Sequence, residues 1–137
     1  MLHGDYHTNN IVMQNDEVLL IDMETLCVGH PVFELASMYL GFVAFGELDH
    51  TITLHSLKLP YETAGMFWEK ALASYLGTRD PDQLRAVEEK AMVLGYARLM
   101  RRTLRRNGFD TEQGRASIGL CKAHLTELLG RVDTLSF

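Results

Sequence analysis

Four residues near the start of the chain have side chains suited to catalysis and lie within eight positions of one another. They are His3, Asp5, His7 and Asn10, in the segment LHGDYHTNN. An acid followed by an asparagine five positions later, on a loop that curls back on itself, can accept a proton from an attacking hydroxyl and hold a magnesium ion during phosphoryl transfer. The pattern therefore predicts Asp5 as a catalytic base and Asn10 as a metal ligand.

A second candidate metal ligand, Asp22, ends the apolar segment VLLID, which we expect to form an antiparallel hairpin with NIVM. A turn centred on Asn15 and Asp16 would pair Asn10 with Ile21, so that Asn10 and Asp22 reach the same open end of the hairpin. An amide oxygen and a carboxylate together suit magnesium. Strict alternation would place the two side chains on opposite faces, so a shared ion requires either that Asp22 has already left the strand or that the turn is one residue longer.

Three motifs in order, HGDYHTNN, LLIDMET and GHPVFELA, resemble the aminoglycoside phosphotransferase and choline kinase superfamily, which has the protein-kinase-like fold. The family patterns are HGDxHxxN, an ID-acid segment and GxPxxDLA, and the resemblance covers residues 2 to about 40 closely. It implies that Asp5 is the catalytic base and that Asn10 and Asp22 bind Mg²⁺ or Mn²⁺. It also implies ATP or GTP as the phosphoryl donor and a small-molecule alcohol as the acceptor.

The resemblance also assigns supporting roles. His3 matches the loop histidine that braces the backbone, and His7 matches a second loop histidine that is either a brace or an acceptor contact. Glu24 matches a second acid near the metal or the acceptor. Glu34 departs from the family pattern, because it stands where the family usually has the aspartate of DLA.

The rest of the chain must position these residues, and its length of 137 residues indicates a single domain. We expect a catalytic loop and metal-binding hairpin over residues 1–30 and a helical body over 31–137. Apolar periodicity predicts about four helices, over 31–46, 61–77, 81–106 and 111–132, with 49–60 as a connection of uncertain type. The predicted fold class is α+β, mainly α-helical, corresponding to a protein-kinase-like C-terminal lobe.

Two packing expectations follow from the same pattern. Both strands of the hairpin are apolar at nearly every position, so we expect both faces to be covered. In the helix over 61–77, helical spacing predicts an inward face of Met66, Phe67, Ala71 and Tyr75.

The glycine-rich loop and strand lysine that hold nucleotide in kinases precede the catalytic loop, whereas here that loop begins at residue 3. We therefore expect the N-terminal nucleotide-binding lobe to be absent and residues 1–137 alone to be nearly inactive. The surface around residues 1–13 would then either meet that lobe or drive self-association, most simply as a symmetric dimer.

Net charge and cysteine content limit the classes of binding partner and indicate a cellular location. A net charge of −5 and an isoelectric point of about 5.6 give no general reason to expect binding to nucleic acid or an anionic membrane. Two cysteines far apart in the sequence favour a reduced, cytoplasmic setting. The acids Glu24, Glu47 and Asp49 favour a cationic acceptor.

Other interpretations stay open at this stage. His3, Asp5 and His7 alternate, so on an extended strand they would share one face, as in a zinc or iron hydrolase. A non-catalytic remnant lobe that binds a partner is a third interpretation. A helical stripe near residue 100 is either solvated and stabilised by the helix dipole or a site for phosphate or another anion, and it contains Arg98, Arg101, Arg102, Arg105 and Arg106.

Overall fold

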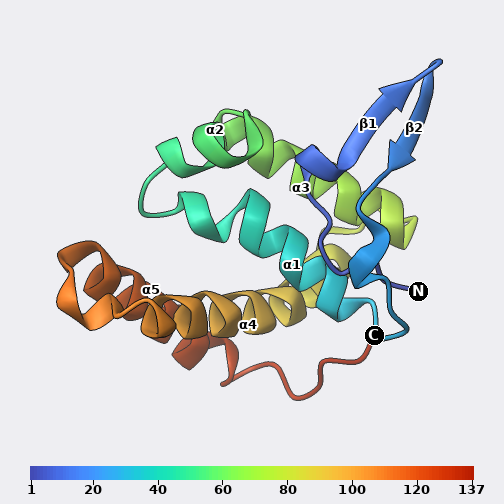
Figure 1. The fold of residues 1–137 in the computed structure, drawn as a ribbon. Coiled ribbons are helices and arrows are strands. Elements are labelled where there is room, and N and C mark those ends of the chain that lie inside the picture. Colours follow the sequence, from blue (N-terminus) through green and yellow to red (C-terminus); the bar gives the residue numbers. More distant parts are fainter.

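The N-terminal loop and a small hairpin sit at one end of a body made of five α-helices (Figure 1). The computed structural model describes all of residues 1–137. Its hairpin consists of β1 (Ile11–Gln14) and β2 (Glu17–Leu20), and its helices are α1 (Val32–Phe42), α2 (Thr51–Leu57), α3 (Tyr61–Leu76), α4 (Pro81–Arg105) and α5 (Glu112–Leu128). The mainly helical α+β prediction is confirmed. The segment 49–60, for which the sequence predicted a connection of uncertain type, contains α2, a fifth helix. No helix in the chain has the length and apolar character needed to cross a bilayer.

The hairpin has the register expected from its turn chemistry. Ile11 pairs with Leu20 and Gln14 pairs with Glu17, so the pairs sum to 31 as predicted. Asn15 and Asp16 both have positive φ, 51° and 63°, which is the backbone of a tight two-residue hairpin turn.

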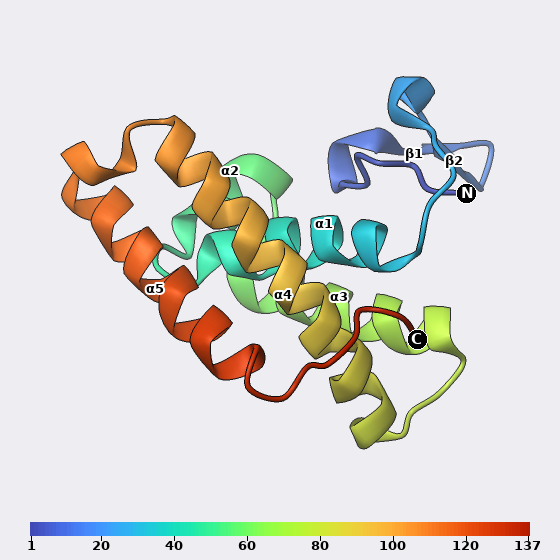
Figure 2. The same cartoon turned by 90° about the horizontal axis from the view of Figure 1, so that it is seen from below.

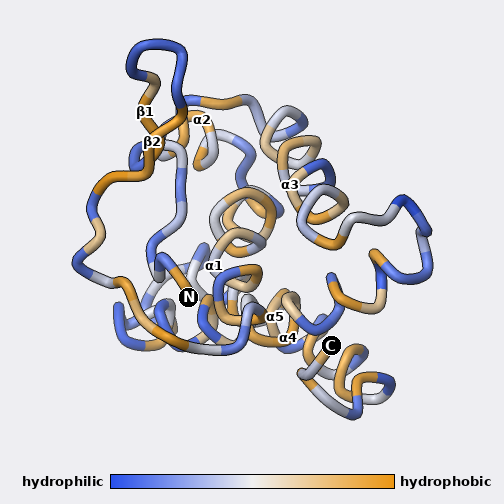
Figure 3. The backbone as a smooth tube through the Cα atoms, turned by 90° about the vertical axis from the view of Figure 1, so that its right-hand side faces the viewer, coloured by the Kyte–Doolittle hydropathy of each residue, from blue (hydrophilic) through white to orange (hydrophobic).

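The expectation that both faces of this hairpin are covered is wrong. The strands project from the helical body (Figures 1 and 3), and the side chains of Met13 and Val18 are 67% and 65% exposed. Figure 3 shows apolar strands leading to a hydrophilic tip. An apolar strand indicates that a surface needs covering, but it does not say which segment covers it, and no helix of residues 1–137 lies on this one.

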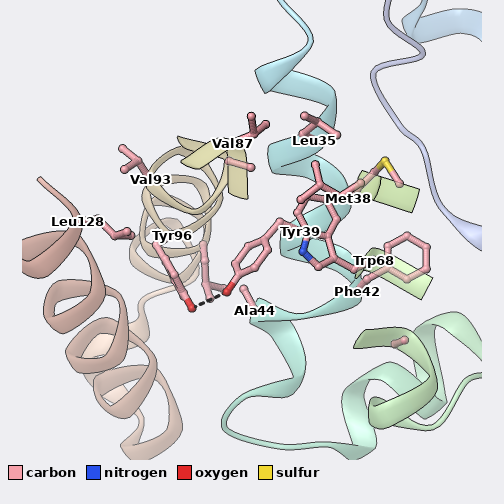
Figure 4. Packing of buried hydrophobic residues seen from close by; sticks show 14 of the residues in the cluster. Leu35, Met38, Tyr39, Phe42, Ala44, Trp68, Val87, Val93, Tyr96 and Leu128 are labelled. Carbon is pink, nitrogen blue, oxygen red and sulfur yellow. Dashed lines mark hydrogen bonds between the residues drawn. The ribbon is translucent and has the colours of Figure 1, made fainter. Parts of the chain in front are cut away.

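The core forms where α1 crosses α4 and α3 (Figures 2 and 4). Tyr39 of α1 makes edge contacts with Trp68 of α3 and Tyr96 of α4, with ring centroids 5.5 and 5.8 Å apart. Gly95 allows α4 to come this close, because a Cβ atom there would lie 3.2 Å from the Tyr39 ring. This packing fixes the first turn of α1, which carries Glu34 towards the N-terminal loop.

The predicted inward face of α3 is partly wrong. Met66 and Tyr75 are 54% and 56% exposed, whereas Ala64, Trp68 and Leu72 are buried. Both sets have helical spacing, and the tertiary packing of the large Trp68 ring selects between them.

A polar network crosses the core from α1 to α5. The Tyr39 and Tyr96 hydroxyls are 3.1 Å apart, Tyr96 donates to Glu47, and His124 Nε2 lies 3.0 Å from the other oxygen of Glu47. Burial raises the pKa of both tyrosines. Glu47 is therefore engaged by the core, and Asp49 accepts from the backbone and hydroxyl of Thr51, so neither acid has the free role expected for an acceptor contact.

Candidate active site

The N-terminal loop is fastened to the segment that follows β2. Leu2 and Cys27 exchange two backbone hydrogen bonds of 2.7 and 3.0 Å, and Thr25 Oγ1 donates to the carbonyl of His3 at 2.6 Å. Residues 2–5 and 21–27 therefore form one connected unit around the base of the hairpin (Figure 1).

His3 is buried and both of its ring nitrogens are engaged. Nδ1 accepts from the Asp5 amide at 3.4 Å, which leaves the proton on Nε2, and Nε2 donates to the carbonyl of Ile21 at 2.9 Å. These contacts are those of a brace between the loop and the end of β2. They leave no ring nitrogen for a metal, which argues against the hydrolase interpretation.

Asp5 presents its carboxylate to solvent. Oδ2 lies 3.4 Å from Nε2 of His7, and the side chains of Asp5 and His7 are 55% and 33% exposed. His7 Nδ1 is buried without a hydrogen-bond partner. The arrangement leaves one carboxylate oxygen of Asp5 without a protein contact, as a group that accepts a proton from a ligand requires.

Asn10 is buried and closes the loop on itself. Its Nδ2 donates to the backbone carbonyl of Asp5 at 2.9 Å, and its own amide donates to the carbonyl of His7 at 2.9 Å, within the 3₁₀ turn Thr8–Asn10. The NH₂ group of the Asn10 side chain is therefore occupied by a hydrogen bond within the protein. Oδ1 receives no donor from the protein and remains available to a ligand.

Asp22 lies directly beyond the residue that pairs with Asn10, because the Ile21 amide donates to the Asn10 carbonyl at 3.0 Å. Its backbone is left-handed, with φ 62° and ψ 58°, so it has left the strand. This is one of the two conditions under which Asn10 and Asp22 are able to share an ion. The exposed carboxylate makes no hydrogen bond to the 3₁₀ turn Met23–Thr25 that follows.

Glu24 lies in that 3₁₀ turn with an exposed side chain that forms no ion pair. It therefore adds a second free carboxylate to the end of the hairpin that carries Asp22. Asn10 Oδ1 and the carboxylates of Asp22 and Glu24 are oxygen donors, the type that Mg²⁺ and Mn²⁺ prefer. No three His, Cys, Asp or Glu side chains lie close enough together to hold a metal ion on their own.

Glu34 supports the loop from α1. Its Oε2 accepts from the Gly4 amide at 3.0 Å, and its Oε1 is buried without a partner. Gly4 has a φ of +84°, and a Cβ there would lie 2.7 Å from the Thr25 carbonyl oxygen. The glutamate thus reaches the backbone next to Asp5 despite the departure from the family's aspartate.

Two further tethers were not predicted from the sequence. Thr8 Oγ1 donates to the carbonyl of Leu57 at 3.2 Å, and Asn9 Nδ2 donates to that of Ser56 at 3.3 Å, so α2 holds the turn that contains Asn10. Both donors come from variable positions of the loop motif, and their partners are more than forty residues away. No local sequence signal points to such contacts.

A comparison with protein-family models assigns the chain to a phosphotransferase class. Residues 1–87 match the model of the phosphotransferase enzyme family, a region that runs from the N-terminal loop into the first turns of α4. The chain belongs to that family. No curated protein and no solved structure matches it.

Proposed function

We propose that this chain is the catalytic lobe of an ATP- or GTP-dependent phosphotransferase that transfers the γ-phosphoryl group to a hydroxyl of a small molecule. The observation that carries the proposal is the 2.9 Å hydrogen bond from Asn10 Nδ2 to the Asp5 carbonyl. This bond curls the loop while leaving Asn10 Oδ1 and a carboxylate oxygen of Asp5 without protein partners. The family membership supports the same chemistry.

In this proposal each residue has one task. Asp5 positions the acceptor hydroxyl and accepts its proton, with His7 steadying the carboxylate from 3.4 Å. Asn10 Oδ1 and the Asp22 carboxylate hold Mg²⁺, for which Mn²⁺ is a substitute. The bound ion supplies neutralisation of the charge on the nucleotide phosphates.

The braces determine how well these groups are oriented. His3 fixes the loop to the end of β2, and Glu34 fixes the Gly4 amide beside Asp5. Such positioning is the larger part of catalysis in phosphoryl transfer. We propose a cationic acceptor, because the exposed Glu24 is a free acid at the same end of the hairpin.

We also propose that the exposed apolar hairpin meets a nucleotide-binding unit in the active enzyme. Met13 and Val18 lie on a projecting strand pair with no cover from residues 1–137. In the absence of that unit, the same surface would favour a symmetric dimer, and nucleotide turnover would be very slow because nothing holds the triphosphate.

Paramagnetic broadening by Mn²⁺ tests the metal assignment on the 137-residue chain directly. The ion should selectively broaden backbone amide signals of residues 5–10 and 21–25, and Asn10→Ala and Asp22→Asn should each abolish this effect. His7→Gln serves as the control, because it changes a neighbouring residue outside the proposed ligand set. Equal broadening in Asp22→Asn, or stoichiometric zinc bound through His3 and His7, would contradict the assignment.

Turnover is measured separately, with ATP or GTP and a panel of amine, sugar and amino-alcohol acceptors. The proposal expects a slow, metal-dependent reaction that Asp5→Asn eliminates. Efficient turnover that survives Asp5→Asn would refute the role of Asp5 as the base.

A further inference from the structure

A second set of candidate binding residues lies along the C-terminal part of α4 and extends to the corner where α4 turns into α5 (Figures 1 and 2). Five of the thirteen basic residues of the chain line a surface hollow there without any other residue type. We call this hollow the arginine groove, and it consists of Arg98, Arg101, Arg102, Arg105 and Arg106. An all-cationic groove on a chain of net charge −5 requires an explanation.

The protein does not neutralise these cations. None of its five ion pairs involves an arginine of the groove, and the sequence contains no acid between Glu89 and Asp110. Arg98 is used within the fold, since it donates to the Phe33 carbonyl at 3.1 Å and to the Ser37 hydroxyl. Burial and the nearby charge of Arg106 both lower the pKa of Arg102, so the cations are held together without a counter-charge.

The helix dipole accounts for only part of the groove. Cations are stabilised within the last turn of a helix, and α4 ends at Arg105. Arg98 and Arg101 lie further back along α4, beyond the reach of that effect. Solvation of a charged stripe also does not account for the cavity that lies beside these arginines.

Such a cavity exists and shares two arginines with the groove. It has a volume of about 360 Å³, within the range of small-molecule sites, and Arg102 and Arg106 belong to both. We call it the corner cavity. Its apolar wall comes from the segment before α2, from the first turn of α2 and from α4, through Ala44, Phe45, Leu48, Ile52 and Leu99.

The remaining wall of the corner cavity is polar. It includes Thr103 and Ser117, together with Gln113 and Gly114 from the first turn of α5. The positive end of that helix thus faces the same space as the two arginines. Arg102 is held across this space with its guanidinium 4.8 Å from the centre of the Phe45 ring.

We propose that the corner cavity and the arginine groove together bind a small organic phosphate, with its phosphate on Arg102 and Arg106 and its apolar part in the cavity. Guanidinium groups match phosphate oxygens in paired hydrogen bonds, and two adjacent arginines match the two charges of a phosphate monoester. The apolar wall distinguishes such a ligand from inorganic phosphate. The site is independent of the proposed phosphotransferase chemistry.

Phenyl phosphate is a direct probe, with inorganic phosphate and phenol as its two halves. In amide-resolved NMR titrations of the 137-residue chain, phenyl phosphate should shift signals from residues 44–52 and 102–117. It should bind at least tenfold more tightly than inorganic phosphate, whereas phenol alone should not bind. Phenyl phosphate that binds no more tightly than inorganic phosphate would overturn the proposal.

Variants separate the two parts of the site. The double variant Arg102→Gln/Arg106→Gln should weaken phenyl phosphate binding at least tenfold, whereas the charge-matched control Arg79→Gln/Arg85→Gln, at the other end of α4, should leave it unchanged. Leu48→Asn should weaken phenyl phosphate but not inorganic phosphate, and because Leu48 is 47% exposed this variant is expected to fold. Equal loss of phenyl phosphate binding in the control double variant would overturn the proposal.

A macromolecular anion is the competing explanation for the groove. A single-stranded oligonucleotide and vesicles of phosphatidylserine and phosphatidylcholine are tested against the same variants. Binding of either one through all five arginines, more tightly than phenyl phosphate and unaffected by Leu48→Asn, would overturn the small-molecule site. Absence of such binding, together with the Leu48→Asn effect, supports it.

Discussion

Gly4→Ala is the substitution that tests most directly how the loop beside Asp5 is held. Gly4 combines a left-handed backbone, φ +84°, with a close approach to the segment after β2. Its amide also donates to Glu34 at 3.0 Å, so a shift of this residue would disturb the brace from α1. The position therefore couples local backbone geometry to the orientation of the Asp5 carboxylate, the proposed base.

The structure sets the size of the effect through two contributions. An L-residue in the left-handed region is disfavoured by about 1–2 kcal/mol. The added Cβ would lie 2.7 Å from the Thr25 carbonyl oxygen and 3.0 Å from Thr25 Cβ, and relieving such overpacking typically costs about 1–3 kcal/mol. Together they predict a destabilisation of about 2–5 kcal/mol for the unit of residues 2–5 and 21–27.

Native-state hydrogen exchange measures this loss where it occurs, because the N-terminal unit is able to open without unfolding the helices. The bonded amides of Leu2 and Cys27 should lose protection in Gly4→Ala, whereas urea unfolding followed through the buried Trp68 should change less. Gly41→Ala is the matched control. Gly41 lies within α1 with no atom within 4 Å of the added Cβ, so the same change should stabilise the protein by up to about 1 kcal/mol. Equal protection in the two variants would refute the account of the loop given above.

Three further outcomes are expected. A thiol reagent at pH 8 should modify the exposed Cys27 but not Cys121, whose buried thiol has its pKa raised to about 11, and denaturant should expose the second thiol. Because the folded state keeps the Cys121 proton to higher pH than the unfolded state, this thiol should lower the free energy of unfolding by up to ~3 kcal/mol between pH 9 and 11 in urea titrations. Cys121→Ala should remove that part of the decline and leave the part above pH 10 that comes from the raised pKa of Tyr39 and Tyr96. Light scattering should show concentration-dependent association that Met13→Ser/Val18→Ser abolishes; a monomeric parent chain would contradict the proposed role of the hairpin surface.

The features that could be predicted from the sequence are those fixed by short-range chemistry. The hairpin register follows from Asn15 and Asp16, two residue types that tolerate the left-handed backbone of a two-residue turn. Four of the helices follow from apolar periodicity, and Asp80 begins α4 by accepting from the Asp82 amide at 3.0 Å. The family motifs place the candidate site in the first 24 residues, and the match over residues 1–87 confirms the family itself.

The features that could not be predicted depend on contacts between distant segments. The hydrogen bond from Gly4 to Glu34 spans thirty residues, and Glu34 is not the residue the family pattern led us to expect there. The sequence groups Glu47 with the acids that favour a cationic acceptor, but packing of α4 and α5 encloses it with Tyr96 and His124. A sequence pattern specifies which groups need partners, whereas the partners themselves are chosen by the tertiary fold.

The backbone of Asp22 is the strongest remaining argument that the open end of the hairpin serves a ligand. Four other non-glycine residues have positive φ, and each has a structural reason: Asn15 and Asp16 form the hairpin turn, Lys58 ends α2 and Asn107 follows α4. Asp22 joins a strand to a 3₁₀ turn without capping that turn. Aspartate tolerates the left-handed backbone better than most residues, and non-glycine residues in this region cluster at functional sites. Since the fold gives the carboxylate no donor, this conformation supports the proposed metal site, because it presents a free oxygen ligand one residue beyond the partner of Asn10.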